Sequence, residues 1–149
     1  MPRFSVIALF LLLRYQTSTA QTGYKETDTL KYTISEIITN VNGFKTTVFY
    51  KGNDIRKITR EFTGSSFSST TIYYITNDQL IHNVFVSKRG ANDYFEEHMY
   101  FANGKMTKWY NTKNKDVKWD QEAFDVKEKL ALHYFEVDLK EAKTKKAMK

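Results

Sequence analysis

The chain has 149 residues, a formal net charge of +6 and no cysteine. A chain of this length fits one domain, and 41% apolar and 15% aromatic residues with a single proline are typical of a globular protein. The lack of cysteine excludes disulfides, thiolate nucleophiles and cysteine-ligated zinc.

The first twenty residues predict an export signal. Arg3 precedes an apolar run at residues 4–13, and Ser18, Thr19 and Ala20 are the small residues expected before cleavage at Gln21. We therefore expect a signal peptide at 1–20, a single domain at 21–149, and a periplasmic or extracellular bacterial protein. The run is too short to span a bilayer, so we expect no integral membrane segment after its removal. The alternative is that residues 4–13 belong to the core.

The C-terminal tail is basic. Removing residues 1–20 takes away two arginines and no acid, which lowers the net charge from +6 to +4. Much of the remaining excess lies in Lys140, Lys143, Lys145, Lys146 and Lys149. Such a tail can bind nucleic acid or an anionic surface, but it is also typical of a solvated helix end. We favour the second interpretation and expect no nucleic-acid partner.

An N-terminal helix is predicted from apolar residues at helical spacing. Asn42 and Gly43 are suited to ending it, although its many β-branched residues lower helix propensity. The stripe consists of Leu30, Ile34, Ile37, Ile38 and Val41.

Alternating polar and apolar residues predict six strands after this helix. Residues 73–81 return in similar form at 99–107, and each copy is typical of a strand, a tight turn and a second strand. Asn103-Gly104 strongly favours a type I′ turn, because both central residues need positive φ. The segments at 45–50, 54–62, 69–76, 79–87, 94–102 and 105–111 therefore predict an antiparallel meander.

The last predicted element is an amphipathic helix that begins after Asp120, a suitable N-cap. Its apolar face needs a large partner, and one face of the sheet is the only candidate. We therefore expect an α+β fold, with about six antiparallel strands, an N-terminal helix and a C-terminal helix packed on one face. The predicted stripe consists of Ala123, Val126, Leu130, Tyr134 and Val137, broadened by Phe124, Ala131 and Phe135.

The repeated hairpin carries a resemblance. The motif is Tyr-aromatic-x-Asn-Gly-Lys-aliphatic, and it resembles a diffuse group of small exported bacterial proteins of unknown function. It is also similar, more weakly, to MORN and YwqK-type repeats, which are richer in glycine and lack a flanking helix. The resemblance implies a fold and no activity. It rests on Tyr100, Phe101, Asn103, Gly104, Lys105, Met106 and Trp109, with a fainter copy at residues 74–80.

Catalytic and metal-binding motifs are scarce. The sequence has no glycine-rich phosphate loop, no Gly-x-Ser-x-Gly and no His-Glu-x-x-His. If strands 79–87 and 94–102 pair, His82 and His98 share a face when paired residue numbers add to 180, and lie on opposite faces when they add to 181. Glu96 would be the third ligand in the first case. A metal needs three convergent ligands, so we expect two strand histidines and no metal or other cofactor.

Tyrosine and tryptophan are the most suggestive residues. The candidate binding residues are Tyr74, Tyr100, Trp109 and Tyr110, because exposed aromatic rings on a sheet stack on sugars or anchor protein partners. The alternative is that they fill the core and the cross-strand ladders. We expect an exported, non-enzymatic binding or interaction domain with a protein or glycan partner. The alternatives are a carbohydrate-binding module that uses exposed sheet aromatics, and a small exported hydrolase with an unrecognised site.

Overall fold

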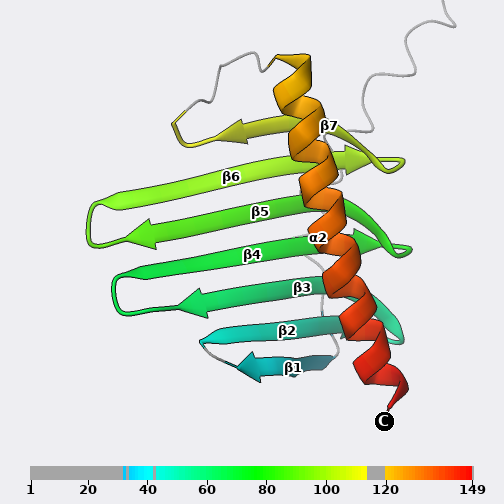
Figure 1. Cartoon of the computed structure of the whole chain (residues 1–149). Coiled ribbons are helices and arrows are strands. Elements are labelled where there is room, and N and C mark those ends of the chain that lie inside the picture. Colours follow the sequence, from blue (N-terminus) through cyan, green and yellow to red (C-terminus); the bar gives the residue numbers. More distant parts are fainter. Residues whose placement is uncertain (1–31, 33, 42, 114–119, 149) are drawn as a thin grey trace, which may run out of the picture. The chain divides into compact units, whose positions relative to one another are not determined.

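A computed structural model describes residues 32, 34–41, 43–113 and 120–148 (Figure 1). The predicted signal peptide at 1–20 lies outside these residues. Each strand of a seven-stranded sheet pairs antiparallel with its neighbour along the chain, which confirms the predicted α+β class and antiparallel meander. The six predicted strands are the last six of this sheet, and one further strand precedes them. The elements are β1 (Ile34–Val41), β2 (Phe44–Lys51), β3 (Asp54–Thr63), β4 (Phe67–Thr76), β5 (Gln79–Arg89), β6 (Asp93–Ala102), β7 (Lys105–Asn111) and α2 (Gln121–Ala147).

The predicted N-terminal helix is wrong over residues 34–41, which form strand β1 against β2. Its apolar spacing is compatible with either structure, but Ile and Val have stiff χ1 rotamers that suit a pleated sheet better than a helix. Gly43 accordingly lies directly before β2 instead of ending a helix, and Asn42 lies outside the described residues.

The tight turns behave as the repeated motif predicts. Asn103 and Gly104 have φ values of 52° and 72°, and Asn77 and Asp78 have 50° and 62°. Positive φ at both central residues is the requirement of a type I′ turn. Because consecutive strands run antiparallel, the β2–β3, β4–β5 and β6–β7 turns lie at one end of the sheet, and the β3–β4 and β5–β6 connections lie at the opposite end.

Helix α2 begins as predicted at Asp120, whose carboxylate accepts a hydrogen bond from the backbone N–H of Ala123 at 2.8 Å. It then crosses one face of the sheet from β7 towards β2 (Figure 1). Glu128 accepts from the backbone N–H of Met106 in β7 at 2.6 Å. Near its other end, Lys146 donates to the carbonyl of Asn53 in the β2–β3 turn at 2.6 Å. These contacts hold the helix against the end of the sheet that carries the tight turns.

The face that α2 buries differs from the predicted stripe. Four of its members are about half exposed: Val126 (52%), Leu130 (48%), Tyr134 (54%) and Val137 (50%). The core receives Ala131 and Phe135, which the predicted stripe included, together with Leu139 and Ala142, which it did not. The apolar residues of this helix cover about half of its circumference. The sheet buries one part of this apolar arc, and the other part stays accessible to solvent.

One helix cannot cover the whole of this sheet face. β5 has 11 residues and is therefore about 36 Å long, whereas a helix with its side chains is about 10–12 Å wide. The part of the face that lies away from the tight turns is open beside α2. Among the described residues, no helix is both long and apolar enough to cross a bilayer.

Candidate functional site

An apolar groove lies between α2 and the open part of the sheet. It has a volume of about 430 Å³. The strands line one side of the groove with phenylalanines. Residues that pair across neighbouring strands point to the same face, as Phe44 and Phe62 do, so their rings lie together. The side chains that make it apolar are Phe44, Phe62, Phe85, Phe95, Leu130 and Tyr134.

The charged groups along the groove are paired within the chain. Lys127 on α2 lies 2.6 Å from the carboxylate of Glu97, and Arg60 lies 3.0 Å from that of Asp138. Burial raises the pKa of Asp138, while the neighbouring Arg60 opposes that shift. Burial also raises the pKa of Tyr73, and the Asp138 carboxylate adds to this effect. The groove therefore presents polar groups without an unbalanced charge.

Trp109, one of the four predicted binding residues, lies on the α2 side of the sheet. Its indole N–H donates to Glu97 at 2.7 Å, and its ring lies 6.5 Å from that of Phe124. The ammonium group of Lys127 lies 5.4 Å from the centre of the indole ring. Trp109 thus supports the Glu97–Lys127 pair that borders the groove.

The other three predicted binding residues gather on the opposite face. This surface, which we call the tyrosine–histidine face, consists of Tyr74, His82, His98, Tyr100 and Tyr110. Tyr74 pairs with His82 across β4 and β5, and His82 pairs with Tyr100 across β5 and β6. The paired residue numbers of β5 and β6 add to 182, so His82 and His98 lie diagonally on one face, as the first of the two predicted registers also required.

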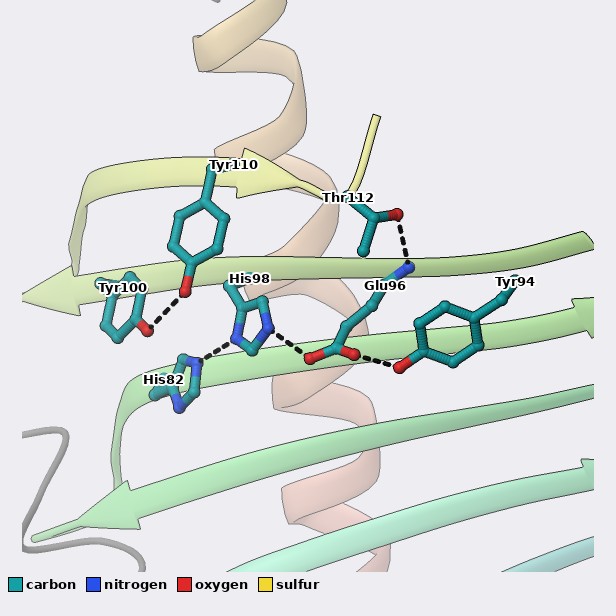
Figure 2. A network of polar contacts seen from close by, with 7 residues as sticks. All are labelled: His82, Tyr94, Glu96, His98, Tyr100, Tyr110 and Thr112. Atoms are coloured by element: carbon teal, nitrogen blue, oxygen red, sulfur yellow. Dashed lines mark hydrogen bonds and ion pairs between the residues drawn. The ribbon is translucent and has the colours of Figure 1, made fainter. Parts of the chain in front are cut away.

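A chain of hydrogen bonds crosses this face (Figure 2). Tyr94 donates to Glu96. Glu96 accepts from Nε2 of His98 at 2.6 Å, and Nδ1 of His98 lies 3.1 Å from Nε2 of His82. With an ionised Glu96, His98 carries its proton on Nε2 and accepts a hydrogen bond from His82. The arrangement orients both imidazole rings.

His82 is held neutral. It is 2% exposed, and burial followed by the charge of His98 lowers its pKa to about 3. The two histidines place nitrogens close together, and a carboxylate behind a histidine is also a common arrangement around metals. However, no group of three or more potential metal-binding side chains converges within the ranges that the structure describes.

The rings of the tyrosine–histidine face stack on one another. The centroid separations are 5.3 Å for Tyr74 and His82, 4.3 Å for His82 and Tyr100, and 4.9 Å for His98 and Tyr110. The two rings of each pair are within 17° of parallel. A sugar or base needs a flat ring face to stack on, and here neighbouring rings occupy those faces. This geometry favours the groove over the tyrosines as the ligand site.

Little in the sequence points to the groove. Its strand contribution comes from phenylalanines near the strand ends, which alternation alone assigns to the core. The better signal was the width of the apolar arc on α2, since an arc of half the circumference exceeds what one flat sheet can bury.

Comparison with known proteins adds no further assignment. No protein-family model, curated protein or solved structure matches this chain. The resemblance to small exported bacterial proteins with repeated hairpins stays a prediction.

Proposed function

We propose that this chain is an exported, non-enzymatic binding domain, and that its ligand site is the groove beside α2. The observation that carries the proposal is the groove itself: about 430 Å³ of space lined by phenylalanine, leucine and tyrosine. Small-molecule sites in proteins are concave, mostly apolar and of this size, with a few polar groups that fix orientation.

The polar groups indicate the kind of ligand. Because Lys127 is paired with Glu97 and Arg60 with Asp138, the groove offers no unbalanced charge to attract an ion. An uncharged, elongated apolar molecule matches such a lining, since its affinity comes from burying apolar surface. Export is part of the proposal and rests on residues 1–20 of the sequence.

Two adjacent aromatic residues of β6 offer a matched test. Phe95 lines the groove, whereas Tyr94 points to the opposite face and is bonded to Glu96. We expect a neutral apolar dye such as Nile red to bind, and long-chain alcohols to displace it. Phe95→Ala should weaken binding about tenfold, equivalent to ~1.4 kcal/mol, because it removes buried apolar contact.

Tyr94→Ala is the control and should leave the dye affinity within about twofold of the wild type. A fluorescence titration of the three proteins decides the matter. Equal loss of affinity in both variants, or no saturable binding to the wild type, would exclude the groove as the site.

A second candidate, a hydrolase, is favoured by one observation, the hydrogen-bonded series Glu96–His98–His82. A carboxylate that orients a histidine is the arrangement that general-base catalysis uses. The test is turnover of a panel of ester, amide and glycoside substrates by the wild type and by His98→Gln. Hydrolysis that disappears in His98→Gln would support this candidate, and a wild type without turnover would reject it for those substrates.

A further inference from the structure

We propose that a second copy of this chain docks on the half-exposed apolar side of α2, forming an antiparallel two-helix interface. The surface, which we call the α2 stripe, consists of Val126, Leu130, Tyr134 and Val137. Spacings of four, four and three residues keep these side chains on one strip of the helix. The strip is about 17 Å long, since Val126 and Val137 are 11 steps of about 1.5 Å apart along the helix.

The stripe is complementary to itself. In an antiparallel pair related by a two-fold axis, Leu130 of one copy lies against Tyr134 of the other, and Val126 lies against Val137. A two-fold interface uses the same patch on both subunits, so each contact occurs twice. All four side chains are half exposed in the single chain, which leaves apolar surface to bury.

Charge along α2 selects the antiparallel direction. The exposed flank carries Glu122 near its start and Lys140 near its end. Lys143 lies farther round the helix and is paired with Asp78 of the β4–β5 turn at 2.6 Å. An antiparallel second copy therefore brings acidic residues opposite basic ones at both ends of the stripe. A parallel copy would place the charged flanks of the two helices on opposite sides of the interface, so these acidic and basic residues would not meet.

The centre of the interface shows the same complementarity. Lys129 and Glu136 are exposed and flank the stripe near the two-fold axis. In the antiparallel pair, Lys129 of one copy lies close to Glu136 of the other. These pairs fix direction and register more than they add affinity, because exposed ion pairs contribute little.

The area of the stripe determines how tightly two copies are expected to associate. Stable interfaces bury about 1,200–2,000 Å² in total, and four half-exposed side chains on each copy supply less than that. The dimer should therefore dissociate in the micromolar range. The stripe shares Leu130 and Tyr134 with the lining of the groove, but the inference does not depend on ligand binding, because association is measured without any ligand.

Sedimentation velocity over a range of protein concentrations provides the test. The wild type should shift from monomer to dimer, and Leu130→Lys should raise the dissociation constant at least about tenfold by placing a charge at the centre of the interface. Tyr94→Lys is the matched control, since Tyr94 is 46% exposed but lies on the opposite face of the sheet. It should change the dissociation constant by no more than about twofold.

A charge exchange tests the direction of the helices. Lys129→Glu alone and Glu136→Lys alone should each weaken association, and the double variant should restore it. Circular dichroism should report an unchanged fold in every variant, because the substituted residues are exposed or half exposed.

Three outcomes would overturn the proposal. The first is a wild type that stays monomeric at all concentrations, even if it binds an apolar dye or an amphipathic peptide along α2. The second is a dimer that Leu130→Lys does not weaken. The third is a double charge variant that associates no better than the two single variants.

Discussion

At the scale of single residues, His82 illustrates how neighbours determine the chemistry of a side chain. It lies in the interior of β5 with Tyr74 and Tyr100 stacked beside it, and its Nε2 is hydrogen-bonded to His98. Burial and the charge of His98 lower its pKa to about 3, below the usual value of 6.5. The folded protein therefore keeps this imidazole neutral where the unfolded chain protonates it.

The pH dependence of stability follows from this difference. Below about pH 6.5 the unfolded chain binds a proton at His82 that the folded chain does not bind until about pH 3, so stability falls as pH falls. Between about pH 7 and pH 5 this group alone should lower the free energy of unfolding by about 2 kcal/mol. Denaturant unfolding of the wild type and His82→Asn measures it. The variant should show a flatter pH dependence, and parallel curves would contradict the assignment of His82 as buried and neutral.

At the scale of elements, six of the strands could be predicted from the sequence, but the buried face of α2 could not. Strands β2 to β7 were predicted because each is half buried with a period of two and bounded by turn residues. β1 was mistaken for a helix because a few apolar residues at mixed spacing fit both periods. The orientation of α2 was missed since its apolar arc is wider than the sheet contact. Which part of the arc is buried depends on the sheet, and the helix sequence alone does not contain that information.

The orientation of α2 makes a prediction about stability. Phe135 packs on Tyr73 in the core with ring centroids 5.7 Å apart, whereas Leu130 is half exposed. Phe135→Ala should therefore cost about 3–5 kcal/mol of unfolding free energy. Leu130→Ala should cost about 1 kcal/mol or less, because much of its surface is already in water. The unfolding free energies should be measured at low protein concentration, where the monomer dominates. Similar losses in both variants would mean that α2 is rotated relative to this structure.

At the scale of the whole molecule, the groove arises from a mismatch of dimensions. Strands of 10–11 residues are longer than the width of the single helix that crosses them, so part of one sheet face stays open. This could not be predicted from motifs, since it depends on where α2 crosses and on the register of the strands. The register also brought His82 and His98 to one face, but its paired residue numbers add to 182, which is neither of the two sums considered from the sequence.

Export makes a separate prediction. Arg3, the apolar run at 4–13 and the small residues before Gln21 predict removal of residues 1–20. The intact mass of protein purified from outside the cytoplasm of its native cells should correspond to a chain that begins at Gln21. A full-length chain in the cytoplasm would contradict export and return residues 4–13 to consideration as part of the fold.

Nuclear magnetic resonance can show whether ligands bind in the groove beside α2. Backbone amide shifts are compared with and without a saturating long-chain alcohol, at a protein concentration where the wild type is monomeric. The largest changes should map to Phe85, Phe95 and the α2 residues from 127 to 134, and Phe95→Ala should reduce them. Changes concentrated instead at Tyr94, Tyr100 and Tyr110 would contradict the account and assign binding to the tyrosine–histidine face.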